Sequence, residues 1–199
     1  MSKEQGMSGD KAGTSHERGQ VMSETSAKPA RATSLDLEPH PEGGWYRRTW
    51  TSDAVVATER GDRPAATLIH FLLAPGEASA WHVVTSDGIW LWHGPDPVML
   101  QRGGSGAEPV AGETTVLGGD ESRGHSAQVL IPAGVWQRTL PSEGESLVSC
   151  LVSPGFSFAD WRLHKDEADD IHEPDDIQEP DDIHDPDNAQ NPDNTPRVS

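Results

Sequence analysis

The stretch PGEASAWHVVTSDGIWLWHG, residues Pro75–Gly94, carries the most information about fold and function in this chain. It contains two runs of alternating apolar residues joined by a short polar turn, and it holds three Trp, two His and one Asp. A period of two is typical of half-buried β-strands. Titratable side chains within such strands indicate the lining of a pocket, so we expect a β-structure with a pocket at this place.

Apolar runs of strand length continue on both sides of this stretch. β-branched and aromatic residues bounded by Gly and Pro are strand signals. They predict strands at Trp45–Thr51, Ala65–Leu73, Ser79–Thr85, Ile89–His93, Val98–Gln101, Glu113–Leu117, Ala127–Ile131, Val135–Leu140 and Ser146–Val152. Residues 53–64 predict a loop, and residues 156–164 predict a last strand or a short helical turn. Short strands at close spacing, with hardly any helical period, predict an all-β sandwich or barrel.

The two ends of the chain differ from this centre in composition. All seven Trp, all three Phe and the single Tyr lie between Trp45 and Trp161. Residues 1–33 are rich in Ser, Gly, Lys and Glu, whereas residues 165–199 are acidic and repeat with a period of six (DDIHEP, DDIQEP, DDIHDP). Such segments bury too little apolar surface to offset the entropy of ordering. We predict a disordered arm (1–33), one domain (34–164) and a disordered acidic tail (165–199).

The charge of the chain limits its partners. The formal net charge is −18, and no cluster of Lys or Arg is larger than the pair Arg47-Arg48. Nucleic-acid binding needs clustered basic residues, and an acidic body is repelled by anionic membranes. We therefore predict no nucleic-acid partner and no membrane partner. No signal-peptide or membrane-spanning run is visible, which predicts a cytoplasmic protein. The single Cys150 is expected to pack as a small hydrophobic residue.

Four segments together carry a family resemblance. They are PHPEGGWYRRTW (Pro39–Trp50), ATLIHFLLAPGEASAWHVVTSDGIWLWHGPDP (Ala66–Pro97), VLIPAGVWQRT (Val129–Thr139) and LVSCLVSPGFSFADWRL (Leu147–Leu163). In this order they resemble the cupin superfamily and, within it, the DUF985 (Cupin_5) family of small RmlC-like cupins. The resemblance implies a double-stranded β-helix (jelly-roll) barrel with a polar pocket, and a homodimer. The activity of the family is largely unassigned, and fold alone does not fix function.

The metal-binding motif of many cupins is incomplete here. That motif supplies His-x-His-x(3,4)-Glu on one pair of strands and a further His later in the chain. On this sequence the first His is His82, but the second falls on Val84, the Glu on Gly88 and the last His on Gln137. One strong ligand of four remains, and Gln is a weak ligand for transition metals. We predict no metal and no cofactor, unless a bulge turns Asp87 or His93 inward.

Candidate pocket residues follow from the same alignment. The cupin register places His82 inside the barrel, where it lines the pocket or, alternatively, is a hydrogen-bonded core His. The period of two from Gly88 places Trp90 and Trp92 on the pocket side, where they form an aromatic wall or simply fill the barrel. Gln137 completes the predicted wall.

Residues next to the first turn of the domain are further candidates. Glu42, Tyr46 and Arg47 flank Gly43-Gly44. An Arg at a barrel mouth can bind a carboxylate or phosphate through two hydrogen bonds, while the alternative is a surface salt bridge. Asp87, in the polar turn of the first stretch, is also counted with the pocket. His70 is expected to be a hydrogen-bonded core His.

Four functional hypotheses remain open. The first is a metal-independent binding protein whose barrel pocket holds a sugar-like or aromatic small molecule. The second is an epimerase or isomerase in which His82, as the catalytic residue, moves a proton next to a carbonyl while Tyr46 or Arg47 stabilises the enolate. A metal-dependent dioxygenase has too few ligands. In the last hypothesis, the chain is a structural or interaction protein, and its acidic tail carries the function.

Overall fold

The computed structural model describes residues 27–164, so the predicted acidic tail and most of the predicted arm lie outside the described part. Its elements are α1 (Ala30–Ser34), β1 (Glu38–Pro39), β2 (Trp45–Thr51), β3 (Val55–Thr58), β4 (Gly61–Pro64), β5 (Thr67–Leu73), β6 (His82–Val84), β7 (Asp87–Pro95), β8 (Val98–Arg102), β9 (Thr114–Leu117), η1 (Glu121–Arg123), β10 (Gln128–Ile131), β11 (Gln137–Leu140), β12 (Ser146–Ser153), η2 (Phe158–Asp160) and β13 (Trp161–Leu163). Between residues 27 and 164, no helix is long and apolar enough to cross a membrane.

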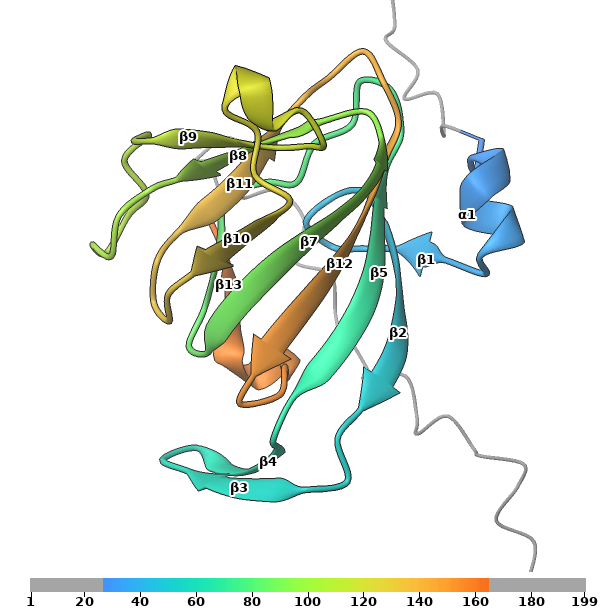
Figure 1. Cartoon of the computed structure of the whole chain (residues 1–199). Coiled ribbons are helices and arrows are strands. Elements are labelled where there is room, and N and C mark those ends of the chain that lie inside the picture. The colour runs from blue at the N-terminus through green and yellow to red at the C-terminus, as the bar shows by residue number, and fades with distance from the viewer. Residues whose placement is uncertain (1–26, 165–199) are drawn as a thin grey trace, which may run out of the picture.

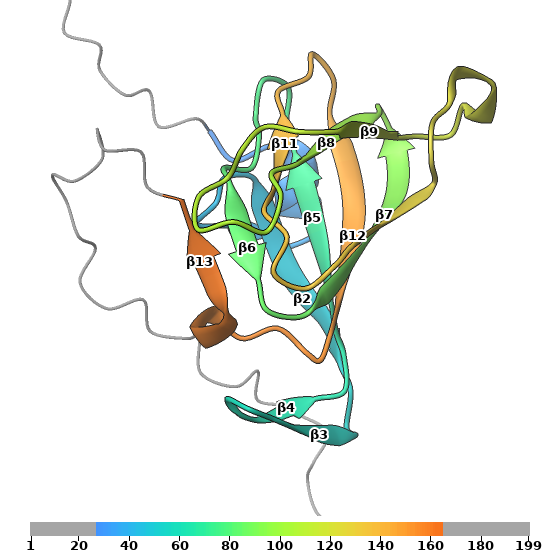
Figure 2. The same ribbon diagram turned by 90° about the vertical axis from the view of Figure 1, so that its left-hand side faces the viewer.

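Two antiparallel sheets face each other and form the barrel (Figures 1 and 2). One has the strand order β1-β2-β5-β12-β7-β10 and the other β13-β6-β11-β8-β9. The main core lies between them, with Phe71 and Trp90 from the first sheet packed in one cluster with Leu100 and Leu117 from the second. Burying alternate residues of both sheets is what joins the layers. The predicted all-β jelly-roll barrel is confirmed.

The stretch Pro75–Gly94 passes from one sheet to the other. Its first run contains β6, which pairs with β11 and β13, and its second run forms β7, which pairs with β12 and β10. The polar turn between the runs is therefore where the chain crosses the barrel. Because of this crossing, His82 on β6 and Trp90 on β7 approach the interior from opposite walls.

The domain begins earlier than the sequence predicts. Residues 30–33, assigned to the disordered arm, form the short helix α1 together with Ser34. Ala32 of this helix is fully buried in a second cluster with Leu37, Leu72 and Leu147. The helix thereby covers one end of the outer face of the six-stranded sheet. Ala32 alone is too weak an apolar signal to predict this contact.

The predicted loop at residues 53–64 contains a hairpin instead. Strands β3 and β4 pair from Val55↔Pro64 to Thr58↔Gly61. The hydroxyl of Thr58 bonds the carbonyl of Gly61, which has a positive φ of 99°. Val55 is 63% exposed. The hairpin is held by local turn chemistry and by the contact of Arg63 with Asp160 rather than by an apolar core.

The turn between β1 and β2 requires glycine at two successive positions. Gly43 and Gly44 have φ values of 102° and 73°, which residues with a Cβ rarely adopt. A Cβ on Gly43 would clash with the carbonyl of Ala78, and one on Gly44 would lie 2.9 Å from the carbonyl oxygen of Leu72 and 3.0 Å from Phe71. The turn therefore fits tightly against the barrel, and it carries the neighbouring Glu42 into the interior.

We predict that Gly44→Ala destabilises the fold more than Gly104→Ala does. Both glycines have φ of 73°, but a Cβ on Gly104 would meet nothing within 4 Å. Gly104→Ala is the control and should lower the free energy of unfolding by about 1–2 kcal/mol, because Ala is strained in the left-handed backbone. Gly44→Ala should lose the same amount and roughly 1–3 kcal/mol more, because its Cβ overpacks the turn. Urea unfolding followed by Trp fluorescence measures both. Equal losses would show that the turn is not tightly packed.

Candidate functional site

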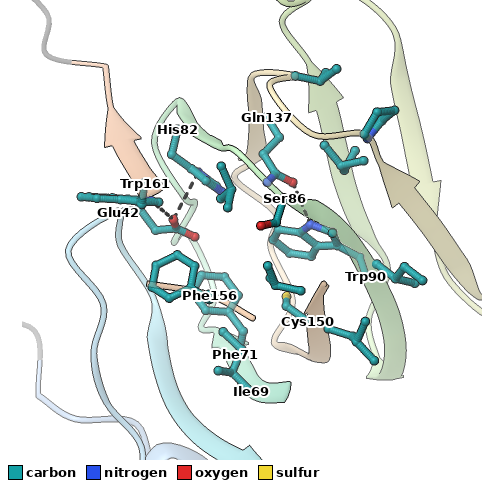
Figure 3. A pocket seen from close by; sticks show the side chains of 18 of the residues that line it. Glu42, Ile69, Phe71, His82, Ser86, Trp90, Gln137, Cys150, Phe156 and Trp161 are labelled. Carbon is teal, nitrogen blue, oxygen red and sulfur yellow. Dashed lines mark hydrogen bonds and ion pairs between the residues drawn. The ribbon is translucent and has the colours of Figure 1, made fainter. Parts of the chain in front are cut away.

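A cavity of about 50 Å³ lies inside the barrel between the two sheets (Figure 3). One water needs about 10–15 Å³ on this scale, so the cavity accommodates a few waters or a compact ligand. Most of the lining is apolar and aromatic, with a small number of polar groups. The polar and thiol side chains are His40, Glu42, His82, Ser86, Gln137 and Cys150, and the aromatic ones are Phe71, Trp90, Phe156 and Trp161.

Glu42 is the centre of the polar part of the lining. Its side chain is buried, and its Oε2 accepts a hydrogen bond from the indole of Trp161 at 3.3 Å. The same oxygen lies 3.2 Å from Nδ1 of His82. The backbone carbonyl of Glu42 accepts from Ala80, which ties the turn to the segment before β6. A carboxylate taken out of water needs such partners, because an unpaired buried charge is strongly destabilising.

The neighbours of His82 determine which of its nitrogens carries a hydrogen. Nδ1 lies 2.9 Å from the carbonyl oxygen of Ala80 and 3.2 Å from the carboxylate of Glu42, and both are acceptors. Nδ1 therefore donates, and in the neutral ring the lone pair is on Nε2. His82 is only 4% exposed and lines the cavity. An imidazole oriented in this way by a carboxylate has the arrangement of a general base.

His40 has a different role from His82. Its Nδ1 accepts a hydrogen bond from the backbone N–H of Glu42 at 3.3 Å, so the 3.6 Å approach to the carboxylate is not a hydrogen bond. Burial lowers the pKa of His40; Glu42 raises it and His82 lowers it, both by smaller amounts. The ring packs edge-on against Tyr46, with centroids 4.6 Å apart. His40 is thus a neutral wall of the site.

Gln137 and Trp90 form the polar contact on the other side of the cavity. The indole Nε1 of Trp90 donates to Oε1 of Gln137 at 2.8 Å, and both side chains are buried. Because an indole can only donate, this bond fixes the orientation of the amide. The amide NH₂ of Gln137 is then left to donate to a ligand oxygen. Both residues line the cavity.

Two of the predicted aromatic residues lie outside the lining. Trp92 is on the same face of β7 as Trp90, but its indole donates to the carbonyl of Asp96 and its ring packs at Gly119. It fills the far end of the barrel. Tyr46 packs against the core and the ring of His40, so it supports the wall from behind. Burial raises the pKa of its hydroxyl.

Arg47 and Asp87 are also separated from the cavity. Arg47 is exposed on β2, one position from the inward-facing Tyr46, and the period of two turns it to the outer face of the sheet. The predicted support of an enolate by Arg47 is therefore not possible in this geometry. Asp87 is exposed and accepts a hydrogen bond from the backbone of Ala133 at 2.8 Å, so it fastens one turn to another.

The residues at the metal-motif positions do not fit a transition metal. Val84 and Gly88 line the cavity but have no ligating atoms. The oxygen of Gln137 is engaged by Trp90, and Nδ1 of His82 by Ala80 and Glu42. No group of three or more His, Cys, Asp or Glu is placed to hold a metal within residues 27–164. We therefore derive no step through a metal.

Sequence reasoning missed several lining residues. His40 lies in the PHPEGG turn, Ser86 in the polar crossing turn, and Phe156 and Trp161 in the last segment. The spacing His40-x-Glu42 was a usable signal, because two titratable residues precede a tight Gly-Gly turn. Cys150 faces the cavity, and burial raises the pKa of its thiol well above the usual range. It stays protonated and packs as a small hydrophobic group.

We predict that the side chains of Trp90 and Gln137 are energetically coupled through their hydrogen bond. Gln137→Met keeps the volume but leaves a buried indole N–H without an acceptor, which should cost about 1–3 kcal/mol. Adding Trp90→Phe removes the donor as well, so the double variant should lose less stability than the two single losses added together. Urea unfolding measures the double-mutant cycle, and Gln128→Met on the exposed face of β10 is the control. Strict additivity would contradict the prediction.

Comparison with known proteins agrees with this architecture. The model of the family described as Cupin superfamily (DUF985) matches residues 30–164. A hypothetical protein from Leishmania major is 33% identical with a TM-score of 0.61, covering 67% of this chain and 84% of its own. A protein from Shewanella oneidensis is 34% identical with a TM-score of 0.62, covering 69% and 84%. No curated protein matches the chain. The chain belongs to the DUF985 family of the cupin superfamily.

Proposed function

We propose that the barrel cavity binds a compact small molecule, sugar-like or aromatic, without a metal. The observation that supports this most is the buried pair of Glu42 and His82 in an otherwise apolar, aromatic cavity. Replacing a buried ion pair by apolar residues is often neutral or stabilising. Stability alone therefore does not account for the pair, whereas orientation of a ligand does. Ligand pockets have this composition, with a few placed polar groups in an apolar wall.

The two walls of the cavity offer different groups to a ligand. On the side of β6, Glu42 and His82 offer an acceptor and a ring nitrogen to hydroxyl groups of a ligand. On the side of β7, the face of Trp90 packs against flat or sugar-like surfaces, and the amide of Gln137 donates to an oxygen. A cavity of about 50 Å³ favours a compact ligand or one compact group of a larger ligand. A homodimer and a cytoplasmic location stay predictions.

We expect Glu42→Gln to weaken ligand binding by about tenfold to a hundredfold, since a hydrogen bond to a charged group contributes about 1.5–3 kcal/mol. A thermal-shift screen of sugars and aromatic acids identifies a ligand, and a ligand at a hundred times its Kd stabilises the unaltered chain by about 2.7 kcal/mol. Glu121→Gln at the surface is the matched control. A screen without a stabilising compound, or equal shifts in both variants, would count against the proposal.

A second candidate function is epimerisation or isomerisation, and the contact between His82 and Glu42 favours it. In this function Nε2 of His82 removes a proton from the carbon next to a carbonyl, and the electron pair of the C–H bond moves to the carbonyl oxygen. The amide of Gln137, rather than Tyr46 or Arg47, is placed to donate to that oxygen. The imidazolium then delivers the proton to the opposite face of that carbon, which inverts it, or to the γ-carbon of a conjugated dienolate, which moves the double bond. Glu42 stabilises the positive charge of the imidazolium.

We predict that His82→Asn separates this function from binding. The Asn amide replaces Nδ1 as the donor to Glu42 and Ala80 but supplies no base in place of Nε2. Exchange of the ligand's carbon-bound proton with D₂O, followed by NMR, should be slowed by roughly 10²–10⁴-fold, while affinity changes only a few-fold. If the unaltered chain catalyses no exchange of a bound carbonyl ligand, the protein binds without catalysing this step.

A further inference from the structure

A second group of polar side chains lies on the outer face of the six-stranded sheet, away from the cavity. It consists of Arg47 on β2, His70 on β5, Ser149 on β12 and His93 on β7, and we call it the outer cluster. These four strands are neighbours in the sheet. The register pairs Arg47 with His70 and His70 with Ser149. Residues paired in this way on one face have Cβ atoms about 4.5–5.5 Å apart.

The period of two places this cluster on the face opposite to the core. Tyr46, Phe71 and Val148 directly adjoin cluster members in the sequence and belong to the interior cluster. Leu72 and Leu147, two positions from His70 and Ser149, pack on the outer face with Ala32 of α1. Successive strand residues point to opposite faces. The outer cluster therefore continues the surface that α1 covers at one end.

Contacts within the cluster hold its members in place. Nε2 of His93 lies 2.7 Å from the hydroxyl of Ser149. The rings of His70 and His93 have centroids 6.3 Å apart. A bulge on β7 produces this approach, because Leu147 pairs with Gly94 and Val148 with Trp92, which leaves His93 as an extra residue. The bulge directs its imidazole toward Ser149.

His70 is not the satisfied core residue that the sequence predicted. Its Nδ1 is buried and has no hydrogen-bond partner within the part of the chain that the structure describes. A buried polar atom without a partner costs about 1–3 kcal/mol. Arg47 beside it is exposed, and no carboxylate of residues 27–164 lies within ion-pair distance of it. Among the described residues, Arg47 thus lacks an anionic partner, and Nδ1 of His70 on the same face lacks a hydrogen-bond partner.

The electrostatic surroundings of the cluster are basic, although the chain has a formal net charge of −18. Burial lowers the pKa of His70, and His93 and then Arg47 lower it further. Every charged group that acts on His70 in this way is a base. An anion placed among them would offset this repulsion. A metal cation would meet the guanidinium of Arg47 and only two imidazoles.

We infer that the outer cluster is a binding site for an oxyanion, either a phosphate or a carboxylate group. Arg47 supplies two parallel N–H donors, which match the oxygen spacing of both groups. The exposed ring of His93 donates when protonated, the hydroxyl of Ser149 beside it completes the set, and His70 adds positive charge when it is protonated. The site lies on the opposite side of the sheet from the cavity, so it does not depend on the proposed function of the cavity.

The test is a calorimetric titration of the full chain with inorganic phosphate and, separately, with malonate at pH 6 and constant ionic strength. At least one anion should bind, and Arg47→Gln should weaken it about tenfold to a hundredfold. Arg138→Gln is the matched control, because it removes the same charge from an arginine that lies over Trp81 elsewhere on the surface. It should change the affinity less than threefold. If only one of the two anions binds, the result shows whether the site takes a phosphate or a carboxylate group.

A second readout does not depend on substitutions. Proton NMR of the imidazole C–H groups should show that the bound anion raises the pKa of His70 and shifts the signals of His93, but leaves the signals of His125, on the loop after η1, unchanged. Absence of binding by both anions would overturn the inference. Equal weakening by Arg47→Gln and Arg138→Gln would overturn it too, because the attraction would then be diffuse. A change of oligomeric state in Arg47→Gln without anion binding would assign the face to a protein interface instead.

Discussion

The buried carboxylate of Glu42 is the constraint on which the site depends. It reaches the barrel interior because the chain turns sharply at Gly43 and Gly44, where a Cβ has no room. Once inside, the carboxylate needs donors, and it finds them on two separate segments, at His82 on β6 and Trp161 on β13. The turn, the two strands and the orientation of the imidazole are therefore linked. A change in any of them leaves a buried charge with too few partners.

The crossing at residues 85–86 has an equally direct consequence for the site. Because β6 and β7 belong to different sheets, one continuous stretch supplies both His82 and Trp90, which are on opposite walls. Asp87 fixes the end of the crossing by bonding the backbone at Ala133, in the turn that leads to Gln137. A residue expected in the pocket thus serves to hold two wall segments together.

The sequence predicts the elements better than it predicts the contacts. Period-two patterning located β2 at its observed limits, and it turned Trp90 inward and His93 outward. The motif alignment assigned His82 and Gln137 to the pocket, and both line the cavity. Alternation gave the face of Trp92 but not its depth along the barrel. Arg47 was assigned by its nearness to the Gly43-Gly44 turn, although alternation along β2 turns it to the outer face. The hairpin β3–β4 was missed because local turn bonds hold it together in the absence of an apolar period.

Alternation along the strands also separates two kinds of chemistry on the two faces of one sheet. Inward positions and the adjoining turn supply an acid, Glu42, surrounded by aromatic rings and neutral amides. Outward positions supply bases, Arg47, His70 and His93, on the surface of an acidic chain. The sheet between them is one layer of backbone, yet the buried carboxylate lies on one side and the exposed bases on the other. Segregation of this kind does not arise from packing requirements, since apolar residues would satisfy both faces. It is the pattern expected when each face has a ligand of its own.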